Sequence, residues 1–410
     1  MINGKKQVRA VILAVFFFIP VFLPCPAKGA SSPLQEIKRL AGPMDAALLA
    51  DPSGRVIVSV NASERLIPAS TLKLLTALTA FHYLGEDYRF KTEFYVRDDG
   101  SLVIKGFGDP LLVSEDVQSI AAFLRKHMDF VHHIILDDTY FAKPLIIPGT
   151  ERDSIQPYDA PCGALSVNFN SFGFRLQEDG SPVSAEPQTP FVDIAREKII
   201  SLTSTAALCS GRIPLSCENN EVPRYAGQVF AFFLAESGIR VTGEIRAGKA
   251  DPGRDMLVYR HVSSLNLTEI ITRLMKSSNN FIANQVFLAA GAKAYGPPAT
   301  LEKGIRAVKQ VAADELKIKG ISMVEGSGIS RENRLSADNF LKILKAFQLH
   351  YHLLRHQDGE YFKTGTLNGI HTRVGYLEGA DGRLYPFVAL INTPGEKTDS
   401  IMKNFKRLIR

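Results

Sequence analysis

The chain has 410 residues, of which 45% are hydrophobic and 22% charged, a composition typical of a globular protein with more than one domain. Its formal net charge of +6 owes most to four cations in the first 30 residues, a stretch that contains no acid, so the remainder is close to neutral. No basic stripe with interleaved aromatic residues occurs, and we therefore expect no nucleic-acid partner.

The N-terminus has the parts of a secretory signal peptide. A positively charged start with Lys5, Lys6 and Arg9 precedes an apolar run over residues 10–23 and then a group of small residues. The run is shorter than the roughly 20 residues of a membrane-spanning helix. Residues 1–30 are therefore predicted to be a signal peptide and the protein to be exported and periplasmic; an uncleaved anchor remains the alternative.

Export implies an oxidising compartment, in which cysteine pairs form disulfides. Cys209 and Cys217 flank a short loop with a glycine and a proline, and whether they are bonded stays open. Cys162 is interpreted as a small buried residue.

The remaining elements, taken in chain order, alternate between helical and strand patterns. A short helix precedes a hairpin with a turn at Asp51–Gly54, and Ser70 then opens a helix. From about residue 90 short strands dominate; helical periodicity returns at residue 265, and strands and a last helix follow. The ranges expected are helices over 34–40, 115–127, 225–237, 281–290, 300–313, 337–350 and 398–408, a loop over 177–190, and strands over 45–49, 55–61, 91–97, 102–105, 134–136, 240–247, 360–367, 372–377 and 385–392.

This order predicts an α/β (α+β) fold with an insertion. Residues 31–93 and 263–410 are expected to form one discontinuous domain, a sheet flanked by helices. Residues 94–262 are expected to form an inserted β-rich domain, and a sub-domain near 166–220 remains an open alternative. No internal repeat or low-complexity tract interrupts this organisation.

The most informative motif is Ser-x-x-Lys at Ser70 and Lys73. The helix that follows has apolar residues on every face, which is typical of a buried helix. A buried ammonium is costly unless it is paired or neutral, and a desolvated lysine beside a serine activates the hydroxyl as a nucleophile. The same spacing at Ser400 and Lys403 lies on an amphipathic helix whose lysine can reach solvent, so we favour the first copy.

Two weaker motifs follow. Lys363, Thr364, Gly365 and Thr366 lie in a predicted strand, where a glycine indicates close approach of another backbone and the lysine supplies charge for a substrate carboxylate. A Ser-x-Asn motif occurs several times. In the copy between two predicted helices, the motif can be formed either by Ser277 with Asn279 or by Ser278 with Asn280. We adopt Ser278 with Asn280 below.

In the order Ser-x-x-Lys, Ser-x-Asn, Lys-Thr-Gly, the three motifs resemble the signature of penicillin-interacting serine enzymes. The long stretch between the first two, together with Lys105–Pro110, Ala164–Asn170 and Glu325–Arg331, is similar to the low-molecular-mass class C penicillin-binding proteins, the D-alanyl-D-alanine carboxypeptidases/endopeptidases. The resemblance covers nearly all of the mature chain. It implies a β-lactamase/transpeptidase-like sheet flanked by helices with the insert described above.

The resemblance also implies the roles of the site residues. Ser70, Lys73 and Ser278 would be catalytic. Asn280 and the residues from Lys363 to Thr366 would bind substrate, the backbone N–H groups of Ser70 and Thr366 would form the oxyanion hole, and Asp137 would contact the amino group of a diaminopimelate side chain. Peptidoglycan stem peptides and β-lactam antibiotics are the expected partners, and no metal or cofactor is required.

Three departures from the family pattern stand out. The segment between Ser336 and Lys363 is short, which leaves one wall of the cleft in doubt; Glu325 replaces the usual aspartate, and Arg373 stands where an apolar residue is common. None of them removes a catalytic group. A β-lactamase or esterase on the same scaffold, and a non-catalytic penicillin-binding cell-wall scaffold or sensor, are the alternative functions.

Other constellations carry less weight. His350, His352 and His356 have the wrong helical spacing for a zinc site and lack a nearby acidic or cysteine cluster. Asp137 and Asp138, taken alone, are interpreted as solvated acids at a strand end. The last helix, over 398–408, is amphipathic; peripheral membrane association is one interpretation, and packing on the sheet is the one we favour.

Overall fold

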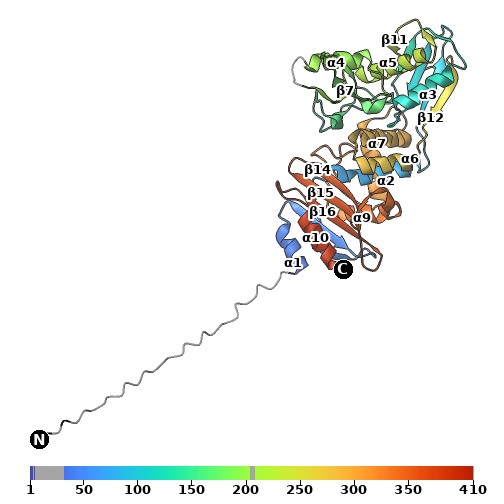
Figure 1. Ribbon diagram of the computed structural model, residues 1–410. Helices are drawn as coiled ribbons and strands as arrows, with labels where there is room; N and C mark the ends of the chain where they lie inside the picture. The colour runs from blue at the N-terminus through green and yellow to red at the C-terminus, as the bar shows by residue number, and fades with distance from the viewer. Residues whose placement is uncertain (3, 5–31, 204–207, 410) are drawn as a thin grey trace.

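The computed structural model describes residues 1, 2, 4, 32–203 and 208–409, so the predicted signal peptide lies almost wholly outside the described residues. Its first part is built on a six-stranded antiparallel sheet in the order β13-β14-β15-β16-β1-β2 (Figure 1). The strands are β1 (Asp45–Ala50), β2 (Val56–Val60), β13 (Arg355–Gln357), β14 (Glu360–Leu367), β15 (Ile370–Glu378) and β16 (Leu384–Ile391).

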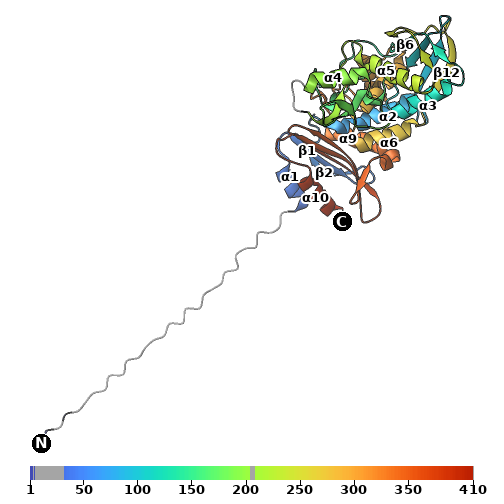
Figure 2. The same ribbon diagram turned by 45° about the horizontal axis from the view of Figure 1, so that its top comes forward.

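Helices cover both faces of this sheet. One face carries α1 (Pro33–Leu40) and α10 (Asp399–Leu408), and the opposite face carries α2, α6, α7 and α9 (Figures 1 and 2). Strand β1 is buried along its whole length because its side chains alternate between the two cores: Leu48 packs with the α2 side and Leu49 with the α10 side. The bounds of these four helices are α2 (Lys73–Leu84), α6 (Leu267–Ser277), α7 (Asn280–Tyr295) and α9 (Ala337–Phe347). A further helix, α8 (Leu301–Asp314), packs against α7 and α2.

The terminal helix α10 packs on the sheet, as the sequence favoured. Its apolar residues Ile401, Met402 and Phe405 are buried in the core that they form with α1 and the outer face of the sheet. These side chains are therefore not available to a membrane surface. Within the described chain, no helix combines the length and hydrophobicity needed to cross a bilayer.

The region predicted as an insert forms sheets of its own beyond the α2, α6 and α7 layer (Figures 1 and 2). A five-stranded sheet has the order β11-β6-β4-β3-β12, a three-stranded sheet the order β8-β7-β9, and β10 pairs with β5. The strands are β3 (Lys91–Val96), β4 (Leu102–Gly106), β5 (Phe130–Val131), β6 (Ile134–Asp137), β7 (Ser171–Leu176), β8 (Pro182–Ser184), β9 (Ser210–Pro214), β10 (Arg240–Val241), β11 (Ile245–Ala247) and β12 (Met256–Val262).

Three helices complete the insert, α3 (Ser114–Leu124), α4 (Asp193–Thr203) and α5 (Glu221–Glu236), with the short turns η2 (Pro157–Asp159) and η3 (Asn168–Asn170). Helix α4 was not predicted, and the strand expected over 240–247 is split into β10 and β11. The helix expected over 337–350 ends at Phe347 and continues as η4 (Gln348–Leu353), which leads into β13. This connection through η4 and β13 is part of the segment between Ser336 and Lys363, which is short in this sequence.

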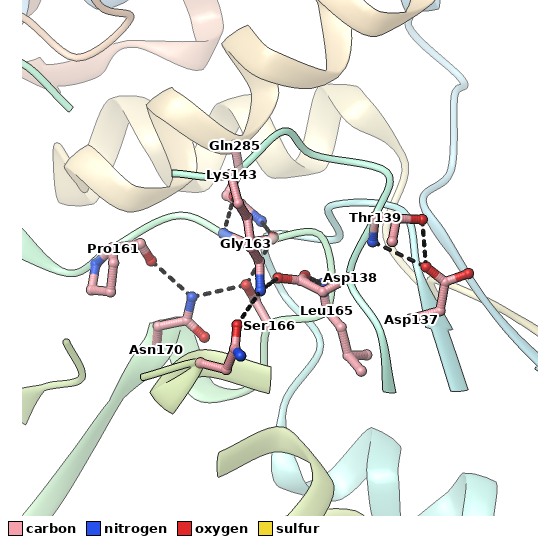
Figure 3. A network of polar contacts seen from close by, with 11 residues as sticks. Asp137, Asp138, Thr139, Lys143, Pro161, Gly163, Leu165, Ser166, Asn170 and Gln285 are labelled. Atoms are coloured by element: carbon pink, nitrogen blue, oxygen red, sulfur yellow. Dashed lines mark hydrogen bonds and ion pairs between the residues drawn. The ribbon is translucent and has the colours of Figure 1, made fainter. Parts of the chain in front are cut away.

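A network of hydrogen bonds connects the insert to α7 (Figure 3). The amide of Gln285, on α7, donates to the carbonyl of Gly163 at 2.9 Å and accepts from the N–H of the same residue at 3.3 Å. On the insert side, Asn170 donates to the carbonyl of Pro161 at 2.8 Å. Because Gln285 is fully buried, this pair of hydrogen bonds fixes the 161–166 stretch close to the helix whose first residue is Asn280.

Candidate active site

The first element of the site is the turn that carries Ser70. Ser70 lies in η1 (Ala69–Leu72), directly before α2, and the preceding Ala69 has a left-handed φ of 47°. Such a φ is strained for a residue with a side chain and persists only where the surroundings enforce it. Lys73 follows one turn later, and its Nζ lies 2.8 Å from the Ser70 Oγ, within hydrogen-bond distance.

The amine of Lys73 is fully buried among neutral partners. It also donates to the Asn280 Oδ1 at 2.8 Å and to the backbone carbonyl of Ser327 at 2.7 Å. Burial, followed by the charge of Lys363, lowers the pKa of Lys73 well below its usual value, and Glu325 opposes the shift. The arrangement therefore favours a neutral amine next to the serine hydroxyl, as the all-apolar helix predicted.

A second serine–lysine pair faces the first. Ser278 caps the end of α6 with a left-handed φ of 57°, and the Lys363 Nζ donates to its Oγ at 2.7 Å and to the Thr364 carbonyl at 2.8 Å. These contacts favour Ser278 over Ser277 as the serine of the motif, because Ser277 instead donates its hydroxyl to the Arg273 carbonyl, within its own helix. Burial lowers the pKa of Lys363 to about 8.

Strand β14 approaches the nucleophile very closely. A Cβ added at Gly365 would lie 2.7 Å from the Ser70 nitrogen and 2.4 Å from the Thr372 Oγ1, both too close for a real side chain. The sequence predicted that Gly365 permits another backbone to come close, and the backbone that lies against it is that of Ser70. Thr364 and Thr366 on the same strand are exposed, so their hydroxyls are accessible to a ligand.

The loop after Glu325 closes the site from another side. The buried carboxylate of Glu325 accepts from the backbone N–H groups of Ser327 (2.6 Å) and Gly328 (2.8 Å) and from the Asn333 amide (2.7 Å). Gly328 needs its left-handed φ of 86° and its missing side chain, because a Cβ there would lie 1.9 Å from the Ala69 carbonyl oxygen. The buried acid at position 325 thus organises the loop through backbone N–H groups.

Sequence reasoning missed two contacts because they are made by backbone carbonyls. The Ser327 carbonyl receives the Lys73 amine, and the Tyr158 carbonyl, in η2 of the insert, accepts from the Asn280 Nδ2 at 3.2 Å. Every residue carries such a carbonyl, so no residue type marks them. The glycines on either side of Ser327 were the only signal for the first contact.

Asp137 is placed differently from the other predicted site residues. Its buried carboxylate accepts from the Thr139 N–H (3.0 Å) and hydroxyl (2.6 Å) (Figure 3). It also accepts from the Ala250 N–H (2.9 Å), and the Lys105 Nζ lies at 3.8 Å. It has no surface to offer to a substrate amine. Nor is its neighbour Asp138 a solvated acid, since it is buried and paired with Lys143 at 2.9 Å.

The remaining sequence observations lie away from this centre. Arg373 points to the α10 side of the sheet, where it pairs with Glu360 at 2.6 Å and stacks on Phe362. Cys162, Cys209 and Cys217 are free. Among the described residues, no cluster of His, Cys, Asp or Glu could hold a metal ion.

This architecture and these serine–lysine pairs belong to a known class. Residues 31–359 match the D-Ala-D-Ala carboxypeptidase 3 (S13) family, and the chain is a member of that family. The class predicted from the three motifs, a serine-type D-alanyl-D-alanine carboxypeptidase among the class C penicillin-binding proteins, is thereby confirmed.

The relatives cover most of the chain at low identity. D-alanyl-D-alanine carboxypeptidase DacB of Haemophilus influenzae is 22% identical and aligns over 86% of this chain and 85% of its own length. The D-alanyl-D-alanine carboxypeptidase of Actinomadura sp. (strain R39) is 26% identical, over 82% and 73%. The crystal structure of penicillin binding protein 4 from Haemophilus influenzae has a TM-score of 0.73 at 19% identity, covering 92% of this chain and 98% of its own, which confirms the fold class. A second structure of that protein holds a β-lactam.

Proposed function

We propose that the protein cleaves peptidoglycan stem peptides ending in D-alanyl-D-alanine through an acyl-enzyme on Ser70. The observation that carries this proposal is the 2.8 Å contact between the Ser70 hydroxyl and the fully buried amine of Lys73. A neutral amine in that position can accept the hydroxyl proton. Carboxypeptidase action releases the terminal D-alanine, and endopeptidase action on cross-links uses the same chemistry.

Acylation begins at the carbonyl carbon of the penultimate D-alanine. The Ser70 oxygen attacks this carbon while its proton passes to Lys73. Negative charge develops on the carbonyl oxygen, and the backbone N–H groups of Ser70 and Thr366 are the proposed donors to it; such a donor contributes about 3 kcal/mol in other enzymes. The C–N bond then breaks: the Ser278 hydroxyl passes its proton to the departing amine and takes up in its place the proton that Lys73 received from Ser70.

The substrate carboxylate is assigned to β14. Lys363 supplies positive charge, and the exposed hydroxyls of Thr364 and Thr366 supply hydrogen bonds. Asn280 already bonds Lys73 through its oxygen and Tyr158 through its nitrogen, so its first role is to orient the lysine. It can also hold the peptide carbonyl if the substrate displaces the 3.2 Å contact with Tyr158. Water completes the cycle by hydrolysing the Ser70 ester.

Export to the periplasm and acylation by β-lactams are part of the same proposal. The first follows from the signal pattern of residues 1–30, and the second from the β-lactam held by the Haemophilus influenzae relative. Asp137 is left out, because its carboxylate is enclosed and already bonded.

The test combines a fluorescent penicillin with purified muropeptides. We expect stable labelling of the wild-type protein, no labelling of Ser70→Ala, and release of D-alanine from pentapeptide-containing muropeptides. Labelling that survives Ser70→Ala would refute the nucleophile. Rapid turnover of penicillin in place of a stable adduct would support a β-lactamase, and labelling without D-alanine release would support a non-catalytic sensor.

A further inference from the structure

A large cavity lies in the insert, apart from the serine–lysine pairs. It has a volume of about 1080 Å³ and is enclosed by the 144–161 segment, by α4, and by the stretch over 215–224 that leads into α5. None of the residues assigned above to catalysis or to substrate binding lines it. Its volume is sufficient for a ligand of several amino acids.

Aliphatic side chains in the cavity wall are exposed. Ile146 is 62% and Ile155 is 36% exposed, and both line the cavity. Aliphatic groups left open to solvent within a concave surface are typical of a ligand site, since burying them on binding is favourable. The wall therefore favours a ligand with apolar groups of its own.

The charges of the wall favour a cationic ligand. The two bases Arg152 and Lys198 are neutralised by ion pairs with acids that also line the cavity, Glu218 and Glu221. Four further lining acids form no ion pair with the described residues, against a single such base, Arg224. These four acids are Glu151, Asp153, Asp159 and Glu197. An anion would be repelled here, and an ammonium group would be attracted.

The cavity wall also reaches the catalytic residues. Within the 144–161 segment, Tyr158 accepts the hydrogen bond from Asn280, the residue that orients Lys73. At Gly149 the same segment lies against the Glu325 loop, because a Cβ there would be 2.6 Å from the Ser330 Cα. One piece of chain thus contributes residues to the cavity wall and contacts to the site.

We propose that this cavity binds a stem peptide that carries a free side-chain amine and lies outside the bond being cleaved. The inference rests on the proposed function, which supplies stem peptides as substrate. The aliphatic wall takes the peptide's apolar groups, and the carboxylates of Asp153 and Glu197 take its amine.

The test measures binding while Ser70 is blocked. The protein is first acylated with penicillin, and the tripeptide L-Ala-γ-D-Glu-L-Lys, as its C-terminal amide, is then titrated calorimetrically. We expect saturable binding that weakens about fivefold or more in Asp153→Asn/Glu197→Gln, since each exposed charge pair is worth up to about fivefold. The Nε-acetylated tripeptide should weaken similarly, and Glu236→Gln, an exposed acid on α5 away from the cavity, should change nothing.

The outcomes separate the two proposals. The double variant should keep the wild-type rate of penicillin acylation and the wild-type unfolding midpoint, which excludes misfolding. Failure of penicillin to acylate Ser70 overturns the proposed function. Normal acylation with no saturable binding of the tripeptide, or with equal binding by the double variant, overturns the cavity inference alone.

Discussion

The amine of Lys73 donates a 2.7 Å hydrogen bond to the backbone carbonyl of Ser327, a residue 254 positions further along the chain. This contact joins the nucleophile's helix to the loop that Glu325 organises. It fixes the amine against Ser70 without supplying a negative charge. The hydrogen-bond partners of the lysine are therefore neutral dipoles, whereas the Glu325 carboxylate bonds to the loop backbone.

Replacing Lys73 should remove acylation while leaving the fold intact. In Lys73→Met, a side chain of similar length fills the same apolar space without a buried amine. We expect the second-order rate of acylation by penicillin to fall by about 10² to 10⁴, the range contributed by a general base. The matched control is Lys403→Met, the exposed lysine of the second Ser-x-x-Lys, which should acylate normally. Near-normal acylation by Lys73→Met would contradict the base assignment.

The pH dependence of acylation should respond to two neighbours in opposite directions. Lys363 lowers the pKa of Lys73 and Glu325 raises it. The neutral amine is lost as pH falls through that pKa, so acylation has an acid limb. Removing the cation in Lys363→Met should move this limb to higher pH, and removing the anion in Glu325→Gln should move it to lower pH. The rate of penicillin acylation between pH 4 and 9 checks both, and shifts of the same sign would refute this electrostatic account.

Substrate binding should weaken in mild alkali. Burial lowers the pKa of Lys363 to about 8, so its charge is lost as pH rises through that value, whereas an unperturbed lysine stays charged to about pH 10. We expect KM for a D-alanyl-D-alanine peptide to rise above pH 8. Lys363→Arg keeps its charge and should give a KM that is higher overall but flat from pH 7 to 9.5. A flat wild-type profile would remove Lys363 from carboxylate binding.

Ser278 and Ser277 provide a matched pair. Ser278→Ala removes the hydroxyl that bonds Lys363, and we expect D-alanine release to slow by about 10²-fold, the lower range for a proton-transfer group. Ser277→Ala removes only a bond to the Arg273 carbonyl and should retain near-normal turnover. The measurement is D-alanine released per unit time at saturating peptide, and a larger loss in Ser277→Ala would reverse the register of the motif.

The close approach at Gly365 can be tested by adding one methyl group. Gly365→Ala places a Cβ against the Ser70 nitrogen and Thr372, and we expect a loss of about 1–3 kcal/mol of unfolding free energy together with slow acylation. Gly211→Ala, in β9, meets only an ordinary 3.6 Å contact with Phe174 and should leave acylation unchanged. Chemical denaturation and the acylation rate are measured together. Unimpaired acylation by Gly365→Ala would show that β14 can move away.

The sequence predicted those parts of the site that depend on residue type and local spacing. Ser70 and Lys73 lie one turn apart, and the apolar residues around them indicate burial directly. Ser278 was harder, because Ser277 fits the same motif and only the contact with Lys363 distinguishes them. The carbonyls of Ser327 and Tyr158 could not be predicted, since their role depends on how distant loops pack.

The fold was predicted best where hydrophobic periodicity is strong, as in the helices of the first domain. Prediction was weaker inside the insert, where α4 carries only three buried residues, Ile194, Ala195 and Ile199. For Asp137, family resemblance supplied a role, and tertiary packing enclosed the carboxylate with Thr139 and Ala250.

The pairing of β1 with β16 has a consequence for how the protein acquires its shape. Asp45 lies opposite Ile391, so two neighbouring strands of the six-stranded sheet come from opposite ends of the described chain. Such distant pairing is slow, because a very long loop must close before any contact rewards it. During synthesis the whole insert is therefore made well before β16, and a nascent polypeptide that ends before residue 384 would lack catalytic activity.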